Sequence, residues 1–295
     1  MLSVLIPTYN YNTFPLVAEL QKQADSSGID YEILVQDDCS NDFLIENNKI
    51  NTLKYCSFCS NEINLGRAKN RNHLASKAKF PWLLLLDCDM FPKESNFIEN
   101  YLLTIKNINK SVVFGGITYK IKRPEKEQLL RWHYGHKRES ISLENRIKKP
   151  NSRALTSNLL INKKLFLDHP FDSAITKYGY EDLSFLMTLE RNKILVSHID
   201  NPAFHLNLES SSLFLNKTRI ALENLAFINS QQTTLSDSKI ISVYSALNKI
   251  RITLVIVFLF NVFENKMINN LLSQNPSLLV FDLYKLGYFC KLQSR

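Results

Sequence analysis

Two aspartates separated by a single residue are the first candidates for chemistry in this chain. Asp87 and Asp89 directly follow the apolar run Trp82–Leu86, which Pro81 precedes. Such a run is typical of a strand buried on both faces, although leucine also suits a helix. In a strand the two carboxylates point to one face and repel each other unless a cation or a donor-rich ligand lies between them. The spacing therefore indicates a site for a divalent metal or a metal-bound phosphate, and the competing interpretation is a solvated strand end with turn-forming aspartates.

The elements that must position these aspartates alternate between strand and helix over the first two-thirds of the chain. Apolar runs predict strands at residues 2–6, 31–36, 83–86, 111–114, 154–161 and 194–198, and helical spacing predicts helices at 14–24, 67–78 and 181–191. Because strands and helices alternate and the strands end in polar residues, we expect an α/β fold with a parallel or mixed sheet. Its ligands should lie at the carboxyl edge of that sheet.

The pattern changes to consecutive helices after about Leu213. The main candidates span residues 217–230 and 238–263, and an apolar tail at 278–292 is a candidate to dock on the second. That second helix contains the run Ile252–Phe260, which is too short to cross a bilayer because a crossing needs about 20 apolar residues. We expect a buried helix packed on the main domain, with a membrane-surface helix as the alternative. The chain thus divides into residues 1–212 and a helical extension at 213–295.

The composition is that of a globular protein with an uneven basic charge. The chain has 295 residues, 45% of them hydrophobic, and a formal net charge of +8. Between Lys120 and Arg153 lie eleven Lys or Arg and four Asp or Glu, so this stretch carries nearly all of the excess. We interpret residues 120–153 as a flexible basic segment that meets a diphosphate, an acidic glycan or a phospholipid surface, and a solvated loop is the plain alternative. The segment has no nucleic-acid recognition motif, so we expect no nucleic acid as a partner.

The cysteines indicate a reducing compartment. Their number, five, is odd, and the chain starts with a strand pattern rather than a signal sequence, so we expect a cytoplasmic protein. Cys56 and Cys59 form a lone CxxC pair without the second pair or the spaced histidine that a zinc site needs.

Five short motifs follow one another across roughly residues 1–210. They are Ser3–Asn10 (SVLIPTYN), Val35–Ser40 (VQDDCS), Asn64–Gly66 leading to Arg71–Asn72, Asp87–Asp89 (DCD) and Gly179–Asp182 (GYED). Together, and in this order, they resemble a family-2 glycosyltransferase of the GT-A fold. The resemblance implies a Rossmann-like mixed sheet flanked by helices that binds a nucleotide sugar, here with a helical C-terminal extension. The family usually has glycine where Cys39 stands, so the turn after Asp38 must form without that conformational freedom.

The resemblance assigns the donor site to the first motifs. The residues that would line the nucleoside pocket are Pro7, Thr8 and Tyr9. Asp38 would accept a hydrogen bond from the base, whereas Asp37 is left as a strand-end or helix-capping residue. Arg71 would contact the diphosphate or support the aspartates, because a fixed cation lowers carboxylate pKa values and holds phosphates. The alternative for Arg71 is a surface arginine on a helix.

The resemblance also separates the two aspartates of the DCD motif. Asp89 would be the direct metal ligand, and Asp87 would lie nearer the ribose or a metal-bound water. A histidine after the catalytic helix is a further ligand in many relatives, and His205 matches that position, with His198 as the competitor. Oxygen ligands together with a diphosphate suit Mn²⁺ or Mg²⁺, so a divalent metal is the expected cofactor.

The last motif supplies the carboxylates that the resemblance makes catalytic. Asp182 would deprotonate the acceptor hydroxyl, while Glu181 would hold the acceptor sugar or be the base itself. Acids at a helix start are ordinarily explained by their interaction with the helix N-terminus, worth about 0.3–1 kcal/mol. On the acceptor side, together with the basic segment 120–153, we expect aromatic platforms for a sugar ring, and core packing is their alternative. The candidates are Trp132, Tyr134, Tyr178 and Tyr180.

The function implied is transfer of a sugar from a nucleotide-diphosphate donor, with a UDP-sugar favoured by the family, to a glycan or lipid-linked acceptor. The reaction would be metal-dependent and inverting, and would serve surface polysaccharide or oligosaccharide biosynthesis in the cytoplasm or peripherally at the inner face of the membrane. The alternative is a non-enzymatic scaffold on the same fold that docks to membranes or partner enzymes. A nucleotidyltransferase is disfavoured because its glycine-rich N-terminal loop is missing.

Overall fold

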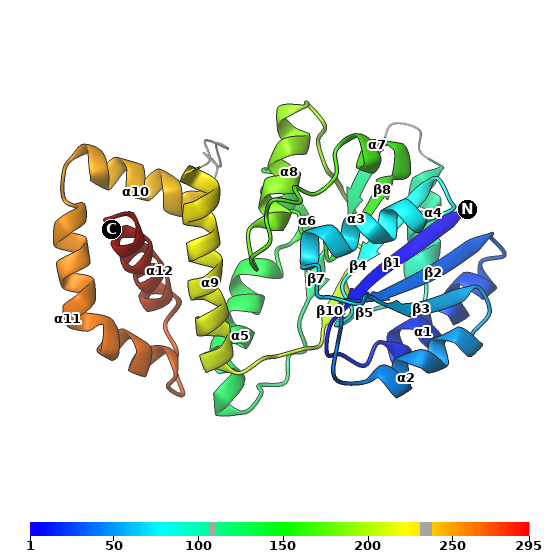
Figure 1. The fold of residues 1–295 in the computed structure, drawn as a ribbon, viewed down its shortest axis with the longest axis horizontal. Coiled ribbons are helices and arrows are strands. Elements are labelled where there is room, and N and C mark those ends of the chain that lie inside the picture. The colour runs from blue at the N-terminus through cyan, green and yellow to red at the C-terminus, as the bar shows by residue number, and fades with distance from the viewer. Residues whose placement is uncertain (107–109, 231–237, 295) are drawn as a thin grey trace. The chain divides into compact units, whose positions relative to one another are not determined.

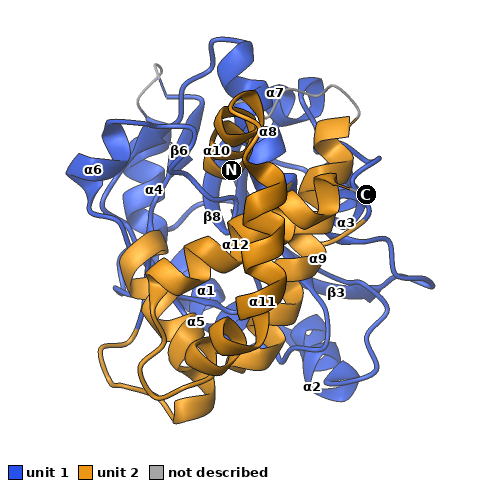
Figure 2. Ribbon diagram, turned by 90° about the vertical axis from the view of Figure 1, so that its left-hand side faces the viewer, with its two compact units in different colours: residues 1–119, 140–176, 181–207 blue, residues 120–139, 177–180, 208–295 orange. Residues whose placement is uncertain are grey.

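The computed structural model describes residues 1–106, 110–230 and 238–294, which form two compact units (Figure 2). Unit 1 consists of residues 1–119, 140–176 and 181–207, and unit 2 of residues 120–139, 177–180 and 208–295. The break at residue 207 lies near the predicted boundary at residue 212. The segments 120–139 and 177–180, however, group with the C-terminal helices rather than with the N-terminal domain.

A seven-stranded sheet forms the centre of unit 1, in the order β3-β2-β1-β4-β8-β6-β9 (Figure 1). Its strands are β1 (Leu2–Thr8), β2 (Tyr31–Asp37), β3 (Cys56–Ser60), β4 (Trp82–Leu86), β6 (Val112–Phe114), β8 (Asn158–Asn162) and β9 (Ser197–His198). β1 is parallel to β2 and β4, and β3 is parallel to β2, whereas β8 runs antiparallel to both β4 and β6. β9 is parallel to β6. The mixed sheet of the predicted α/β fold is therefore confirmed.

A second, three-stranded sheet has the order β5-β10-β7 and consists of β5 (Met90–Pro92), β10 (Ala203–His205) and β7 (Ile117–Thr118). β10 is antiparallel to β5, with His205 opposite Met90, and parallel to β7. Strands of two or three residues are too short to show an alternating pattern, so the sequence did not predict this sheet. Its consequence is that the end of β10 lies beside the residues that follow β4.

Helices flank the main sheet of unit 1. They are α1 (Phe14–Ser26), α2 (Leu44–Asn48), α3 (Arg67–Lys77), α4 (Phe97–Ile105), α6 (Leu143–Ile147), α7 (Lys163–Asp168) and α8 (Glu181–Arg191), with a 3₁₀ helix at Lys49–Thr52. The core lies between the helices and the sheet, where the side chains of β1 and β4 are almost wholly buried. The predicted helices at 14–24, 67–78 and 181–191 are confirmed. β3 escaped prediction because Phe58 is its only fully buried residue.

The basic segment 120–153 is not one solvated loop. It is divided between the two units and contains a 3₁₀ helix (Lys126–Gln128), α5 (Leu129–Tyr134), a π-helical turn (Gly135–Glu139) and α6. Arg131 is buried and lies 2.9 Å from the Glu139 carboxylate, and Arg146 is buried and donates to the Ile199 carbonyl at 3.0 Å. An arginine can be buried when carboxylate or carbonyl oxygens accept its hydrogen bonds. A count of charges along the sequence does not reveal which groups do so.

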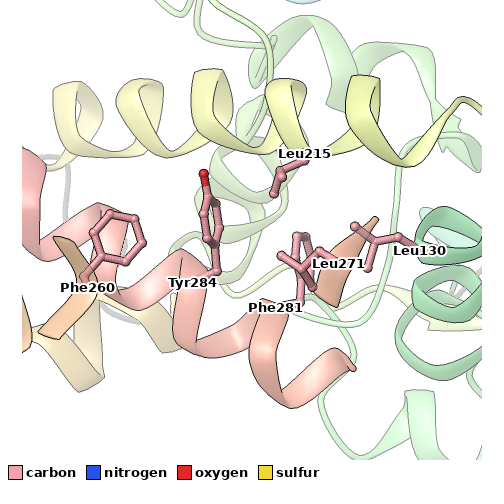
Figure 3. Close-up of a cluster of buried hydrophobic side chains, with 6 residues drawn as sticks. All are labelled: Leu130, Leu215, Phe260, Leu271, Phe281 and Tyr284. Atoms are coloured by element: carbon pink, nitrogen blue, oxygen red, sulfur yellow. The ribbon is translucent and has the colours of Figure 1, made fainter. Parts of the chain in front are cut away.

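Unit 2 is helical, and its core cluster consists of Leu130, Leu215, Phe260, Leu271, Phe281 and Tyr284 (Figure 3). Besides α5 it contains α9 (Ser211–Ser230), α10 (Lys239–Lys249), α11 (Thr253–Leu271) and α12 (Leu278–Gln293). The prediction of one helix over residues 238–263 is wrong, because the chain turns between α10 and α11. Arg251 lies at this turn with a left-handed φ of 58°, a conformation that does not continue a helix.

The expectation that the Ile252–Phe260 run is a buried helix is also wrong. Half of the twelve large apolar side chains along α11 are exposed, and only Phe260 and Leu271 of this helix are buried. The run is apolar around its whole circumference, but its neighbours within unit 2 cover one side only. Within the described residues, α11 is the one helix whose length and composition would suffice to cross a membrane.

Candidate active site

The carboxyl ends of β1 and β2 bring the first two motifs together. Thr8 and Asp37 are paired in the sheet register, and the Asp38 N–H donates to the Thr8 carbonyl at 2.9 Å. Thr8 Oγ1 in turn accepts from Thr13 Oγ1 at 2.9 Å, and the Tyr9 side chain is exposed. The motif predicted to line a nucleoside pocket is thus the carboxyl end of β1, followed by the exposed aromatic ring of Tyr9.

The two neighbouring aspartates after β2 have different environments. Asp37 is fully buried and accepts hydrogen bonds from the backbone N–H (2.9 Å) and the hydroxyl of Ser40, so it stabilises the turn after the strand. Asp38 accepts from the N–H groups of Leu65 (2.8 Å) and Gly66 (2.9 Å) and from the Asn61 amide (2.9 Å). These three donors leave about one of the four acceptor positions of a carboxylate for a ligand.

Cys39, the residue that stands in place of the family's glycine, adopts a left-handed φ of 65°. The turn therefore needs the conformation that glycine adopts most easily, and this chain accepts the strain of placing a side chain there.

Asp87 lies between two arginines of α3. Arg71 Nη2 is 2.6 Å from Asp87 Oδ1, and Arg67 Nη2 is 3.0 Å from Asp87 Oδ2. Burial by itself would raise the pKa of Asp87, but the two guanidinium groups outweigh it and lower the pKa to about 2. Arg71 is 1% exposed, which excludes the surface-arginine alternative, and its guanidinium also lies 5.4 Å from the centre of the Phe171 ring.

The same two arginines reach the carboxylates at the start of α8. Arg67 Nε is 2.6 Å from Glu181 Oε1, and Arg71 Nη1 lies 3.8 Å from the same atom and 3.6 Å from Asp182 Oδ1. Burial raises the pKa of Glu181, and Asp182 adds to this, while Arg67 and Arg71 oppose it. Asp87, Glu181 and Asp182, which are far apart in sequence, therefore share one pair of cations.

Glu181 and Asp182 differ in accessibility and in partners. The Glu181 side chain is 5% exposed, and its Oε2 is buried with no hydrogen-bond partner in the part of the chain that the structure describes, whereas the Asp182 side chain is 21% exposed. Asp182 Oδ1 accepts from the hydroxyl of the fully buried Thr156 at 2.6 Å. Of the two carboxylates, Asp182 is the one that an incoming group can reach.

Asp89 lies beside His205, not beside His198. His205 Nε2 is 3.4 Å from Asp89 Oδ2, and the Leu206 N–H donates to the Asp89 carbonyl at 2.9 Å. His205 also stacks on Tyr119, with ring centres 5.3 Å apart. His198 Nε2 is instead 2.9 Å from the Pro150 carbonyl, and its ring packs edge-on against Phe114. The structure thus distinguishes the two histidines that the sequence left as competitors.

Asp89 and His205 fit a divalent metal that also binds a ligand. Their carboxylate oxygen and imidazole nitrogen are donors that Mn²⁺ accepts. Among the described residues no group of three or more His, Cys, Asp or Glu side chains is arranged to hold an ion. A metal at this pair therefore needs oxygen ligands from a bound molecule, as is usual where Mg²⁺ or a similar ion meets a diphosphate.

The middle residue of the motif, Cys88, is held as a neutral thiol. Burial raises its pKa to about 12, and Asp89 and Asp87 add to this effect. The Tyr11 hydroxyl behaves similarly: its pKa is raised to about 12 by burial and then by Asp89 and Cys88. Both groups therefore remain protonated near neutral pH.

The four aromatic residues predicted on the acceptor side all belong to unit 2. Tyr134 packs against Phe214 and Phe281, at 5.3 and 5.6 Å between ring centres, so core packing describes its role. The Trp132 N–H donates to the Lys120 carbonyl at 3.0 Å. Lys217 lies 5.4 Å over the Tyr178 ring, and burial raises the pKa of Tyr180 to about 12.

Two residues of the site were missed by sequence reasoning. Arg67 is four residues before Arg71, so the two lie on one face of α3, and this spacing was a usable signal. Thr156 had no such signal, because a threonine just before a strand has many ordinary explanations.

Comparison with known proteins identifies the family and the fold of this chain. The family model of glycosyl transferase family 2 matches residues 3–169. No curated protein sequence matches the chain significantly. Among solved structures, TarS of S. aureus is 18% identical with a TM-score of 0.51, and the match covers 79% of this chain and 44% of TarS. The chain thus spans less than half the length of TarS.

A second similar structure is the mannosyltransferase PcManGT from Pyrobaculum calidifontis, in complex with GDP-Man and Mn²⁺. It is 13% identical with a TM-score of 0.53, and the match covers 78% of this chain and 64% of PcManGT. At these identities the likeness shows the fold alone, which is the GT-A glycosyltransferase fold with a helical C-terminal part. Since the family model covers more than half of the residues, this chain belongs to glycosyl transferase family 2.

Proposed function

We propose that this chain is a metal-dependent, inverting glycosyltransferase that moves a sugar from a nucleotide-diphosphate donor to a hydroxyl of a glycan or lipid-linked acceptor. The observation that carries the proposal is the contrast between the two carboxylates at the start of α8. Glu181 is buried against Arg67, whereas Asp182 is accessible and held by Thr156. A site with one fixed and one reachable carboxylate is suited to a single general base.

Asp182 is the proposed base. One of its carboxylate oxygens takes the proton of the acceptor hydroxyl as that oxygen attacks the anomeric carbon of the donor sugar. The bond between the anomeric carbon and the diphosphate oxygen breaks, and its electron pair leaves with the diphosphate. Because attack and departure occur on opposite faces, the configuration inverts. Thr156 orients Asp182 through the 2.6 Å hydrogen bond.

Arg71 and Glu181 are proposed to form the fixed part of the site. Arg71 Nε and Glu181 Oε2 are buried and have no hydrogen-bond partner among the described residues. Unpaired buried polar atoms are uncommon in native proteins, and their position at this site supports a role in holding a ligand. Arg71 keeps Asp87 ionised, while Glu181 fixes Arg67 and so acts as a positioning residue.

Asp89 and His205 are the residues that would hold a divalent ion, Mn²⁺ or Mg²⁺. When bound, such an ion supplies positive charge that neutralises a diphosphate leaving group. Asp38 and the Pro7–Tyr9 segment at the end of β1 are proposed to hold the nucleoside. The donor complex of PcManGT, which contains GDP-Man and Mn²⁺, supports a nucleotide sugar with a divalent metal as the ligand class.

The finer identity of the reaction follows from the family resemblance. We propose a UDP-sugar as donor and a role in surface polysaccharide or oligosaccharide biosynthesis. All five cysteines are free thiols, which supports a cytoplasmic setting.

The test has a binding arm and a turnover arm. Calorimetry with UDP- and GDP-sugars in the presence of Mn²⁺ should detect donor binding, and donor hydrolysis or transfer should fall about 10²–10⁴-fold in Asp182→Asn. Glu190→Gln, an exposed change on the same helix, is the matched control and should retain full activity. If no nucleotide sugar binds, the scaffold alternative replaces the enzyme. If donors bind but Asp182→Asn turns over normally, the base assignment is wrong.

A further inference from the structure

The positive charge of this protein resides in unit 2. That unit contains 17 Lys and Arg against 8 Asp and Glu, a formal charge of +9, while the whole chain carries +8. Unit 1, which contains the candidate active site, is therefore close to neutral. The excess positive charge therefore lies outside the unit that contains the candidate active site. Such a charge favours binding of unit 2 to an anionic partner.

The exposed face of α11 is a continuous apolar stripe. Six large apolar side chains recur there at spacings of three and four residues and are 40–70% exposed: Leu254, Val255, Phe258, Leu259, Val262 and Phe263. Ile250 and Ile252 extend the stripe into the turn before the helix and are exposed too. Contiguous exposed apolar surface of this kind marks an interaction site. We call residues 250–263 on this side the α11 stripe.

The opposite face of α11 is committed to the core of unit 2. Phe260 packs against α12 at Gly287, where an added Cβ would lie 2.4 Å from Phe260 Cδ2 (Figure 3 shows Phe260 in the cluster). A helix that is packed on one side and bare on the other cannot be surrounded by lipid, although its length would allow a crossing. It can instead lie in the plane of an interface, with only the bare side immersed.

Cations flank both ends of the α11 stripe. Lys249 and Arg251 stand at the turn before the helix and Lys266 near its end, and all three are exposed and have no ion-pair partner among the described residues. Lys266 Nζ lies 5.6 Å over the Phe263 ring, so its stem covers apolar surface while the ammonium stays at the rim. This is the arrangement of a lysine at a membrane interface.

The acids near the stripe are already neutralised. Glu264 on α11 is paired with Arg219 (3.2 Å) and Lys291 (3.5 Å). Asp282 on α12 is paired with Arg138 (2.6 Å) and Lys285 (2.9 Å). The cations around the stripe are therefore left to act on an external partner.

We propose that the α11 stripe and its flanking cations dock unit 2 on an anionic phospholipid surface, with α11 lying in the plane of that surface. Charge decides between the two occupants that an apolar stripe can have. A second copy of this chain would bring another unit of charge +9 against the first, which is repulsive, whereas anionic headgroups complement Lys249, Arg251 and Lys266. The apolar side chains that lie between these cations then contact the boundary between the headgroups and the acyl chains.

The experiment is co-sedimentation of the full-length chain with phosphatidylcholine vesicles that contain or lack phosphatidylglycerol. The wild-type chain should bind the anionic vesicles, bind neutral vesicles weakly, and dissociate as salt rises. The double change Lys249→Glu with Arg251→Glu should lower the partition coefficient by about tenfold or more. Lys22→Glu with Lys164→Glu, two exposed sites in unit 1, makes the same change in net charge and should have a much smaller effect.

The contribution of the apolar side chains of the α11 stripe is tested with Leu254→Asp combined with Phe258→Asp. Both side chains are exposed, so the fold should persist, and an unchanged thermal midpoint verifies this. Vesicle binding should be lost, whereas Ile45→Asp on exposed α2 should leave it unchanged. The proposal is overturned if wild type does not bind anionic vesicles, or if the control pairs weaken binding as much as the stripe variants. A dimeric wild type that does not bind vesicles, and that the change Leu254→Asp with Phe258→Asp converts to a monomer, would show that the α11 stripe binds a second copy of the chain instead. Donor binding in unit 1 is measured separately, so neither proposal depends on the other.

Discussion

Arg71 Nη2 lies 2.6 Å from Asp87 Oδ1, and this ion pair connects α3 to the end of β4. The guanidinium is buried and also faces Glu181 and Asp182 on α8. One side chain thus links the strand that carries the DCD motif to the helix that carries the proposed base.

Replacing Arg71 with Met should destabilise the protein by about 1.5–3 kcal/mol, because the partly buried Asp87 carboxylate would lose its closer charged hydrogen-bond donor and keep only Arg67. Chemical denaturation measures this directly. Lys69→Met, an exposed change on the same helix, should stay within about 0.5 kcal/mol of wild type. A decrease of less than about 1 kcal/mol in the free energy of unfolding of Arg71→Met would show that the Arg71–Asp87 pair contributes little to stability.

The stability of the protein should fall in acid through Asp87. Its pKa is lowered from 3.8 to about 2, so the ionised carboxylate stabilises the fold above the unfolded value, and this contribution is lost as the pH falls from about 4 toward 2. Urea denaturation of wild type and Asp87→Asn across this range should give a flatter profile for the variant. Parallel profiles would contradict the assignment.

Glu181 should act in the opposite direction. Burial raises its pKa above 4.5, so its contribution to stability is present below the unfolded value and is lost as the pH rises through the folded one. The free energy of unfolding of Glu181→Gln should therefore fall less than that of wild type as the pH rises above about 4.5. The same denaturation series tests this, with Glu190→Gln as the exposed control, and a variant that behaves like Asp87→Asn would refute it.

Thr156→Val should lower turnover about tenfold while leaving donor affinity nearly unchanged, because the hydroxyl contacts Asp182 and no donor-binding residue. Thr188→Val on α8, the helix that carries Asp182, is the matched control. A variant whose donor affinity falls together with its turnover would point to a packing defect rather than to lost orientation of the base.

His205→Ala should weaken Mn²⁺ binding by about 10–100-fold, whereas His198→Ala should not. The reason is their placement, since His205 is 3.4 Å from Asp89 and His198 is engaged with the Pro150 carbonyl. Calorimetric titration of Mn²⁺ in the presence of a nucleoside diphosphate separates the two variants. Equal losses, or none, would exclude His205 as a ligand.

Gly287→Ala should destabilise unit 2 by about 1–3 kcal/mol, because the new Cβ would lie 2.4 Å from Phe260 and force the helices apart. Gly28→Ala is the control, since it has a positive φ of 62° but nothing within 4 Å, and should cost about 1 kcal/mol from backbone strain alone. If Gly287→Ala is tolerated as well as Gly28→Ala, the close approach of α11 and α12 is wrong.

Much of unit 1 could be read from the sequence because its signals are local. The apolar runs of β1, β2 and β4 predict strands, and their polar ends predict that Thr8, Asp38 and Asp87 meet at one edge of the sheet, since the carboxyl ends of parallel strands lie side by side. The order of the motifs was enough to indicate the family. These conclusions needed no knowledge of which residues pack together.

Three features were decided only by the tertiary structure. His205 rather than His198 lies beside Asp89 because β10 pairs with the very short β5. Arg67 and Arg71 meet Glu181 because α3 and α8 come together across more than a hundred residues of chain. The apolar run of α11 is exposed rather than buried because its neighbours cover a single side. In each case the outcome depends on partners distant in sequence, and burial and ion pairing are properties of those partners as much as of the residue itself.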